Sequence, residues 1–555
     1  MGIREHTKKA LRQVAGRFGY DVVKTTLRMG KEAVRRTRDS GRQWLYFSRP
    51  ASGSVELNRL GSVYYVTEGP SLDRELCKTN FVWVTAALDA AHINWWWVDG
   101  IGAKARRIIG VAEADRKQTL QALVAAAQAD AAGAAVRAAA VTGRNPHFPL
   151  NNERSLSQWQ EVQILRVARF SYSAESNRTR GLKFGCDIEF WRFDPDGMAT
   201  APRENRAAAS LDPASAELTF AKRHGEEVRL PVVFNDTMLE DITFDIDVVY
   251  TWVDGDDPAW QRKKAEASPD AADAPALHSE STHEARFRSR DELLYSLRSL
   301  DDYAPWVRNV FIVTDSQVPH WLNTDNSRVR VIDHTEIFPD DGRLPVFNSN
   351  AIISRLHHIP GLSEHFIYIN DDVMLGRPVS PQQFFLASGI ALVSGSRNHR
   401  PFGPPSVSVE PHLNLTRNIR ELLRDVTGRT VTRAIKHTPH PLTKSTMMEL
   451  EELFAEAFDR TTRQKFRHHT DIVADQLHHY YALMQGRAAP SSLTYTYLTI
   501  RDDSYEPLMA DLLMRRHRDS FCLNDAPVAG AKAISQDVVQ DFMRSYFSAP
   551  SQFER

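Results

Sequence analysis

Short runs of β-branched and aromatic residues, each ended by carboxylates, recur in the second half of the chain. Residues 246–253 read Ile-Asp-Val-Val-Tyr-Thr-Trp-Val before Asp254, and residues 365–370 read His-Phe-Ile-Tyr-Ile-Asn before Asp371 and Asp372. Runs of this length bounded by polar residues predict buried strands. Open α/β sheets bind ligands at the carboxyl ends of their strands, so these endings predict a site. Strand-end carboxylates also cap helices, which leaves the chemistry open.

Helical periodicity alternates with these strands. Residues 290–302 place four leucines on one helical face, namely Leu293, Leu294, Leu297 and Leu300. Residues 309–314 and 328–332 predict two further strands. Alternation of strands and helices predicts an α/β fold with a mostly parallel sheet covered on both faces.

The first half of the chain has a different pattern. Residues 63–66 and 183–191 predict strands, and the Ala-rich residues 113–141 predict a long helix. Three consecutive tryptophans stand at 95–97. Neighbouring side chains point to opposite sides, so at least one belongs to the core, while another could stack on a sugar ring.

These patterns predict a separate N-terminal α/β domain over residues 46–240 and a second domain over 241–555. Residues 261–282 are rich in Ala, Asp, Ser and Pro and predict a loop that is either a lid over a ligand site or a disordered insertion. Residues 397–411 are rich in proline and predict a loop that joins the two halves of the second domain.

A chain of 555 residues is longer than a domain with a single hydrophobic core usually is, so more than one domain is expected. The 69 Lys and Arg residues nearly balance the 70 Asp and Glu residues, which argues against nucleic acid as a partner. The chain has three cysteines, Cys77, Cys186 and Cys522, which are far apart in the sequence and form no CxxC pair. This pattern argues against a disulfide scaffold and against a thiolate zinc site, and it fits a protein of a reducing compartment. No apolar run reaches the roughly 18–20 residues of a membrane span. These features predict a cytoplasmic protein.

Charge is concentrated at the beginning of the chain. Residues 1–42 hold twelve Lys or Arg against four acidic residues, and apolar residues recur at helical spacing, namely Leu11, Val14, Ala15, Phe18 and Val22. A basic amphipathic arm over residues 1–45 could lie on an anionic membrane surface, on the inner face of the cell membrane. The alternative is a helix that docks on the protein's own core.

Four separated segments of the second domain share their order and spacing with a known family. They run from Ile246 to Gly255, from Arg290 to Val373, from His437 to His468 and from Phe521 to Glu554. In these segments the chain resembles the Stealth family of sugar-phosphate transferases, which includes bacterial exopolysaccharide phosphotransferases and the lysosomal-enzyme N-acetylglucosamine-1-phosphotransferase. The first 240 residues carry no such resemblance.

The resemblance implies a Rossmann-like or GT-A-like sheet with a metal-dependent active site. It assigns three catalytic residues, Asp372, His437 and Arg467. A histidine near neutral pKa can transfer a proton, and arginine presents a planar fork to phosphate. Mg²⁺ or Mn²⁺ would be held by four residues, Asp371, Asp372, Asn524 and Asp525, because magnesium prefers oxygen ligands.

Four residues of the first segment, Asp247, Tyr250, Trp252 and Asp254, would line a nucleotide pocket, although Trp252 could instead serve packing. Three weaker candidates for diphosphate contacts are Arg298, Arg308 and Asn348. One departure concerns Ile353, which stands where the family usually carries Glu. An apolar side chain cannot bind metal, so that family role is either supplied elsewhere or reduced.

The implied reaction transfers hexose 1-phosphate or N-acetylhexosamine 1-phosphate from a nucleotide diphosphate sugar to a saccharide hydroxyl, in exopolysaccharide or capsule synthesis. Nucleoside monophosphate would be released. One alternative is a GT-A-like glycosyltransferase, which releases nucleoside diphosphate. Another is a catalytically silent carbohydrate-binding protein, which releases neither.

Overall fold

The computed structural model describes residues 57–60, 63–101, 106–141, 147–151, 157–268, 287, 289–500, 505–524 and 536–555. The basic arm predicted over 1–45, most of the loop predicted over 261–282 and Asp525 lie outside these ranges. The chain divides into two compact units. Unit 1 comprises residues 1–69, 79–95 and 111–190, and unit 2 comprises 70–78, 96–110 and 191–555.

Unit 1 is built mostly on antiparallel strands. β5 (Val136–Ala140) pairs with β6 (Phe148–Pro149) and β7 (Ile164–Arg169), and β7 pairs with β10 (Cys186–Phe193). A second sheet has the order β1-β2-β8-β9, with bounds Leu57–Leu60, Val63–Glu68, Ser171–Ser173 and Arg178–Arg180, and in it β2 and β8 form a parallel pair. The strands predicted over 63–66 and 183–191 are therefore confirmed, the second with its start shifted to Cys186.

The long helix predicted over 113–141 is wrong in its second half. A 3₁₀ turn (Glu113–Asp115) leads into α3 (Arg116–Ala129), and after a second turn (Gly133–Ala135) the chain enters β5. Asp130 ends the helix in an extended conformation, and its carboxylate accepts from the backbone N–H of Ala132. The small side chains of β5 fit between β6 and β7, so burial in the sheet overrides the helix propensity of alanine.

The three tryptophans form β3 (Trp95–Trp97). Trp96 and Trp97 are buried and Trp95 is partly exposed, which confirms the predicted place in the core. The Trp97 indole donates to Asp99, at 2.7 Å. α2 (Asp73–Ala90) precedes this strand, and β4 (Ile108–Ala112) pairs with it.

Unit 2 is built on a five-stranded sheet of order β17-β16-β15-β18-β23. Four strands are parallel and β23 is antiparallel to β18. Their bounds are β15 Ile246–Thr251, β16 Val310–Thr314, β17 Val329–Asp333, β18 His365–Asn370 and β23 His440–Thr443. The α/β fold with a mostly parallel, Rossmann-like sheet is confirmed.

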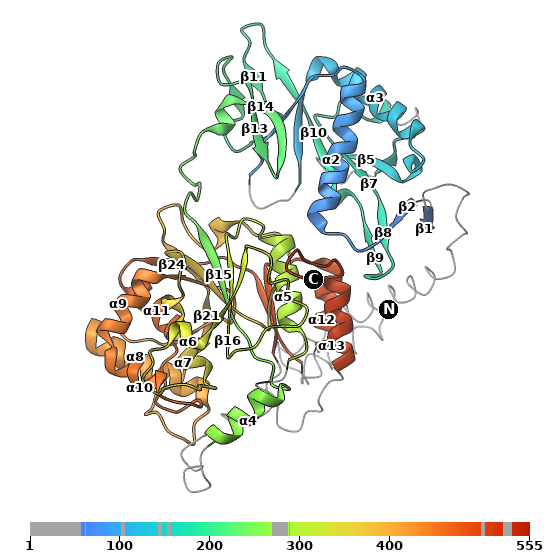
Figure 1. Cartoon of the computed structure of the whole chain (residues 1–555). Helices are drawn as coiled ribbons and strands as arrows, with labels where there is room; N and C mark the ends of the chain where they lie inside the picture. The colour runs from blue at the N-terminus through green and yellow to red at the C-terminus, as the bar shows by residue number, and fades with distance from the viewer. Residues whose placement is uncertain are drawn as a thin grey trace, which may run out of the picture. The chain divides into compact units, whose positions relative to one another are not determined.

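Helices cover both faces of this sheet (Figure 1). Val248 and Tyr250 of β15 pack in one apolar cluster with α5, α12 and α13, whereas Val249 packs in another with α7 to α11. The bounds of the described helices of this unit after β15 are α4 Pro258–Ala267, which packs apart from the sheet, and α5 Glu292–Tyr303, α6 His334–Ile337, α7 Ser349–Ile353, α8 Pro411–Thr427, α9 Lys444–Leu453, α10 Ala455–Thr462, α11 Ala474–Met484, α12 Tyr505–Arg515 and α13 Gln536–Tyr546. Alternate residues of one strand thus serve opposite layers.

Smaller sheets complete unit 2. β19 (Val373–Leu375) pairs antiparallel with β26 (Ser520–Asn524), which pairs parallel with β25 (Tyr495–Thr499). Further two-stranded sheets are β13–β14 (Leu218–Arg223 with Glu226–Pro231), β20–β24 (Ala391–Val393 with Ala488–Pro490) and β21–β22 (Gly395–His399 with Arg433–Ile435). β11 (Ala199–Thr200) and β12 (Ser210–Leu211) instead continue the sheet that contains β10. Residues 400–410, between β21 and α8, lie within the loop predicted over 397–411 and form no helix or strand.

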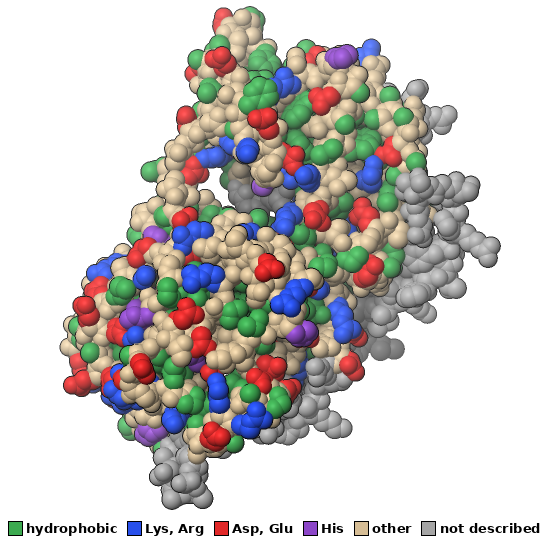
Figure 2. Space-filling view, viewed as in Figure 1, with side chains coloured by type: hydrophobic (Ala, Val, Ile, Leu, Met, Phe, Trp, Pro, Cys, Tyr) green, Lys and Arg blue, Asp and Glu red, His purple; other side chains and the backbone are tan. Residues whose placement is uncertain are grey.

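The surface carries mixed charge. On the face drawn in Figure 2, acidic and basic side chains are interspersed, as the formal net charge of −1 leads one to expect. Among the helices that the structure describes, none is both long enough and apolar enough to cross a membrane.

Candidate active site

The candidate site lies where β18 ends. Asn370 is the last residue of the strand, Asp371 and Asp372 follow, and β19 begins at Val373. In the sheet, β15 has β16 on one side and β18 on the other, although β16 and β17 both precede β18 in the chain. The strand order therefore reverses between β15 and β18. Ligands of open α/β sheets bind at such a reversal, outside the carboxyl ends of the strands.

Asp372 contacts residues from two other segments. Its Oδ1 lies 3.2 Å from Nε2 of His437, and its Oδ2 accepts from the Cys522 thiol at 3.2 Å. Burial favours a neutral His437 ring, but the Asp372 carboxylate outweighs it and raises the pKa of the imidazole above its ordinary value. The aspartate thus stabilises the protonated histidine, as a proton acceptor in catalysis requires.

The Cys522 side chain is buried beside the Asp372 carboxylate. Burial raises its pKa well above the ordinary value, and the neighbouring Asp372 and Asp371 carboxylates raise it further. Cys522 therefore donates a hydrogen bond to Asp372.

Two more carboxylates stand close to Asp372. Burial raises the pKa of Glu292, at the first position of α5, to about 7, although the backbone N–H of Arg290 donates to its carboxylate. Burial also raises the pKa of Asp371 well above its ordinary value, and the charges of Asp372 and Glu292 add to the effect. Several carboxyl groups therefore lie close together, and burial and mutual repulsion disfavour the state in which all of them are ionised.

A hydrogen-bonded chain connects His437 to the sheet. Asn370 Nδ2 lies 3.0 Å from His437 Nε2, and the Tyr368 hydroxyl donates to the Asn370 side-chain oxygen. Thr251, at the end of β15, lies 3.0 Å from the same hydroxyl through its Oγ1. Because His437 Nε2 can either donate to Asp372 or accept from Asn370, the proton on this nitrogen decides which contact forms.

Arg467 reaches the same region from the segment after α10. Its guanidinium donates to Ser349 Oγ at 2.6 Å, and its charge lowers the pKa of His437 slightly against the effect of Asp372. Next to Ser349, Asn348 is buried, caps α7 by accepting from the backbone of Asn350, and donates to Asp471 at 2.8 Å. Asn348 therefore fixes the position of the neighbouring Ser349, whose hydroxyl contacts Arg467.

Asp247 and Arg308 lie at the opposite end of the sheet. Asp247 is the second residue of β15, whose carboxyl end is Thr251. Its buried carboxylate accepts from Arg308 Nε at 2.9 Å and from the backbone N–H of Ser363 at 2.8 Å. The sequence predicted that Asp247 and Arg308 contact the nucleotide donor. Instead, their side chains form an ion pair with each other, and the structure does not bring them to the carboxylates at the end of β18.

Arg298 and Tyr250 are also occupied elsewhere. The Arg298 guanidinium donates to both oxygens of Glu554, at 2.9 and 2.7 Å. Tyr250 is buried, and its hydroxyl lies 2.9 Å from Ser296 Oγ, which in turn donates to the Val373 carbonyl. Tyr250 is thus connected through Ser296 to the backbone of Val373, the residue after Asp372.

Trp252 and Asp254 lie just beyond the end of β15. Trp252 is partly buried and packs against the apolar cluster under α5, as the packing alternative predicts. Asp254 is partly exposed, and its carboxylate accepts from the backbone N–H of Asp256. Both remain at the carboxyl end of the sheet, where a ligand would bind.

Asn524 is the last residue of β26. The β19–β26 ladder pairs Val373 with Cys522, and beyond it the Leu523 N–H donates to the Asp372 carbonyl, which brings the end of β26 close to Asp372. Asp525 follows directly but is not described. Ile353, at the end of α7, is buried in the apolar cluster that includes Phe366 and Leu442. Its side chain is therefore part of the core of this chain.

Two residues near the site were not predicted as functional. Glu292 belongs to the second segment of the family resemblance, but its sequence position gives no signal beyond the start of a helix. Tyr497 of β25 is 41% exposed, and its ring centroid lies 6.2 Å from that of His437. Only the pairing of β25 with β26 brings it there, so a motif could not reveal it.

Among the described residues at this site, Asp372, His437 and Cys522 offer ligand atoms that all lie within 4.8 Å of one another. The side chains of Glu292, Asp371, Asp372 and Asn524 offer oxygen atoms, the type of ligand that Mg²⁺ prefers. The raised pKa values of Glu292 and Asp371 reflect burial and mutual repulsion, which a bound cation would relieve.

Models of a known family match four segments of the chain. They are the Stealth conserved regions 1, 2, 3 and 4, matched over residues 244–271, 286–393, 436–483 and 510–555. Asp371, Asp372, His437 and Asn524 fall within them. The exopolysaccharide phosphotransferase SCO6023 of Streptomyces coelicolor is 39% identical over 496 residues, which cover 86% of this chain and 83% of the relative. The exopolysaccharide phosphotransferase CpsY of Mycobacterium tuberculosis is 36% identical over 413 residues, 72% of this chain and 75% of the relative.

Solved structures similar to this chain include two sugar transferases. The galactosyltransferase LgtC, in complex with donor and acceptor sugar analogues, is 9% identical with a TM-score of 0.26, and the match covers 54% of this chain and 95% of LgtC. Mouse xyloside xylosyltransferase 1 is 13% identical with a TM-score of 0.25, and the match covers 51% of this chain and 99% of the mouse protein.

Proposed function

Because the chain belongs to the Stealth family, we propose that it transfers a sugar 1-phosphate from a nucleotide diphosphate sugar to a saccharide hydroxyl in exopolysaccharide or capsule synthesis. The observation that carries the proposal is the contact between Asp372 and His437 beside clustered carboxylates at the strand reversal. The transferred group is hexose 1-phosphate or N-acetylhexosamine 1-phosphate.

In this proposal the acceptor hydroxyl oxygen attacks the phosphorus that carries the sugar. The new P–O bond forms while the bond between this phosphorus and the oxygen bridging to the second phosphate breaks, and nucleoside monophosphate leaves. The hydroxyl proton goes to the His437 imidazole, and Asp372 stabilises the resulting imidazolium through its 3.2 Å contact with Nε2. The sugar C1–O bond stays intact throughout.

Arg467 supplies positive charge for the transferring phosphate. Its guanidinium is anchored by Ser349, whose backbone lies next to the buried Asn348. A fixed arginine needs little reorganisation when charge develops on phosphate oxygens. Arg467 therefore acts mainly in the transition state, while Trp252, Asp254 and Tyr497 are the candidates for contacts with the substrates.

A bound Mg²⁺ or Mn²⁺ would neutralise diphosphate oxygens. We propose Asp371, Asp372 and Asn524 as its ligands, with Glu292 as an additional oxygen donor and Asp525 as a candidate from the residues that the structure does not describe. The oxygen donors of these residues support a hard cation, because Mg²⁺ and Mn²⁺ prefer oxygen ligands.

The fate of the phosphorus that carries the sugar tests the reaction. The purified chain is incubated with Mg²⁺, a saccharide acceptor and a donor labelled at that phosphorus. We expect the label in the saccharide, as a phosphodiester, together with unlabelled nucleoside monophosphate. Label recovered only in nucleoside diphosphate would identify a glycosyltransferase and contradict the proposal. No release of nucleotide from any donor sugar would support the carbohydrate-binding alternative.

A further inference from the structure

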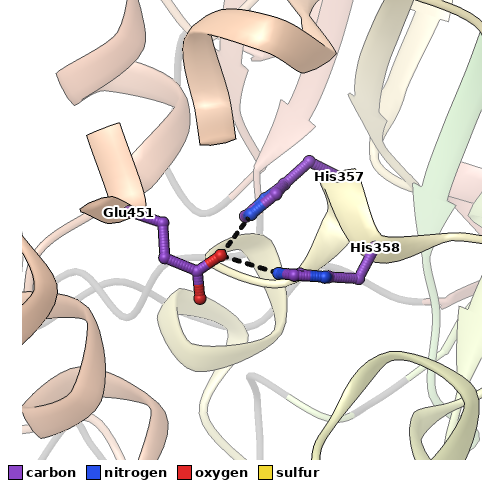
Figure 3. Close-up of side chains that lie close together, drawn as sticks. All are labelled: His357, His358 and Glu451. Carbon is purple, nitrogen blue, oxygen red and sulfur yellow. Dashed lines mark hydrogen bonds and ion pairs between the residues drawn. The ribbon is translucent and has the colours of Figure 1, made fainter. Parts of the chain in front are cut away.

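A second cluster of metal-ligating side chains lies on the crossover that leads to β18. His357 and His358 end the 3₁₀ turn η8 (Leu356–His358), and Glu451 lies on α9. The Nε2 atoms of both histidines lie 2.7 Å from the same oxygen, Oε2 of Glu451 (Figure 3). None of these residues belongs to the site described above.

The convergence of the two rings is unusual for neighbours in a helical turn. Adjacent positions normally point in different directions. Here the ring centroids are 4.2 Å apart, and both rings face the α9 carboxylate (Figure 3). Three donor atoms, two imidazole nitrogens and one carboxylate oxygen, therefore meet at one point, and all lie within 4.8 Å of one another.

The surroundings orient these groups. Arg355 donates to the other Glu451 oxygen and to the Ile337 carbonyl, so the carboxylate is held with Oε2 toward the histidines. The His357 side chain is fully buried, and in the part of the chain that the structure describes its Nδ1 has no hydrogen-bond partner. His358 and Glu451 are 34% and 26% exposed, so solvent and ions can reach the point where the rings meet.

We propose that His357, His358 and Glu451 form a binding site for a divalent transition metal, with zinc as the favoured ion. Two histidines and one glutamate are a known zinc donor set that leaves a fourth position open, here toward solvent. The imidazole nitrogens disfavour magnesium and calcium, which prefer oxygen. The contact of Arg355 with the remaining carboxylate oxygen is the kind of outer interaction that orients a metal ligand.

Metal binding requires each histidine to carry its proton on Nδ1 and to offer the Nε2 lone pair. The exposed side of His358 allows its Nδ1–H to bind water, but the buried Nδ1 of His357 has no such partner among the described residues. This limits the affinity. The metal would connect η8 to α9 and would stabilise the folded state, because it binds the native chain and not the unfolded one.

The test uses the full chain with Asp372→Asn as background, so that the first site contributes little metal. After treatment with a chelator, the protein is titrated with zinc, and bound metal is measured by elemental analysis. We expect one zinc per chain and a midpoint of thermal unfolding that rises with the logarithm of free zinc. Cobalt in place of zinc should give the visible absorption of a four-coordinate site. A chain that binds no zinc and no cobalt overturns the proposal.

Variants assign the ion to this cluster. Glu451→Gln and His358→Ala should each abolish the zinc-dependent rise of the unfolding midpoint, and His358→Ala removes a partly exposed side chain that the core does not need. Glu449→Gln is the matched control, because Glu449 lies on the same helix and contacts Arg487 and Tyr481 but no histidine. Equal loss of zinc in the control, or unchanged zinc binding in both site variants, would place the metal elsewhere and refute the assignment.

Discussion

At the scale of single residues, the site depends on one carboxylate with two partners. Asp372 is partly exposed, and its side chain contacts His437 and Cys522. Asp372→Asn keeps the shape but removes the charge, so turnover should fall by a factor on the order of 10² or more while the fold survives. The pKa of His437, followed by NMR, should decrease because the carboxylate no longer raises it.

Asp245→Asn is the control for this experiment, since the Asp245 side chain is 65% exposed and pairs with the Arg308 guanidinium at the far end of the sheet. It should leave turnover and the His437 titration unchanged. An Asp372→Asn enzyme with normal turnover would remove Asp372 from the chemistry.

Glu292 predicts a specific dependence of stability on pH. Burial raises its pKa from 4.5 to about 7 in the folded chain, so the folded state binds a proton that the unfolded state has already lost. The resulting stability is present below pH 4.5 and is lost as the pH rises to about 7. The shift corresponds to at most about 3 kcal/mol.

The variant Glu292→Gln cannot ionise, so it should lack this loss. Chemical denaturation of both proteins without metal should show the variant gaining stability relative to the parent between pH 4.5 and 7. Added Mg²⁺ should reduce the difference if Glu292 donates to the cation. A constant difference across this pH range would show that the pKa of Glu292 is not raised.

At the scale of elements, the boundary between α3 and β5 depends on a glycine. A Cβ at Gly133 would lie 1.7 Å from the Ala127 carbonyl oxygen, at the end of α3. The helix end and the following turn cannot both keep their positions with a side chain there. Gly133→Ala should therefore destabilise the protein by about 2 kcal/mol or more.

Gly69→Ala provides the comparison, because a Cβ at Gly69 meets no atom within 4 Å. Thermal unfolding should separate the two variants clearly. Equal midpoints would mean that the chain leaves α3 by a different path from the one described.

The strands and helices of unit 2 could largely be predicted because their apolar patterns have clear periods. The patterns over 246–253, 309–314 and 328–332 correspond to β15, β16 and β17. The helix over 113–141 could not be predicted correctly, since a run of alanines suits both a helix and a buried strand. Long-range packing, which one sequence does not reveal, decides between the two.

The site could be predicted in part for the same reason. The carboxylates after β18 follow from the strand pattern, and His437 and Arg467 from the family resemblance. Glu292 and Tyr497 depend on pairings across distant segments and leave no local pattern. Asp247 shows the opposite case. The strand that contains it ends in carboxylates, which suggested that Asp247 contacts a ligand. Asp247 lies instead near the amino end of that strand, beside Arg308.

At the scale of the whole molecule, the last residues of the chain hold several segments of unit 2 together. Phe553 is buried, its carbonyl accepts from the Asn323 backbone, and Glu554 binds Arg298 of α5. Phe553→Ala should lower the free energy of unfolding by about 3–5 kcal/mol, as for other buried aromatic residues. Leu239→Ala, at a side chain that is 92% exposed, should change it little. Chemical denaturation measures both, and a similar small effect for the two would show that the C-terminal segment contributes little to stability.

The pairing of β26 with β19 also sets the order of events during protein synthesis. The Asp372 backbone and side chain receive hydrogen bonds from Leu523 and Cys522, about 150 positions later in the chain. At an elongation rate of about 5–20 residues per second, Asp371 and Asp372 wait on the order of ten seconds or more for these partners. A nascent chain cannot complete the candidate site before Ser520–Asn524 has left the ribosome, so the contacts of Asp372 form only after these residues emerge.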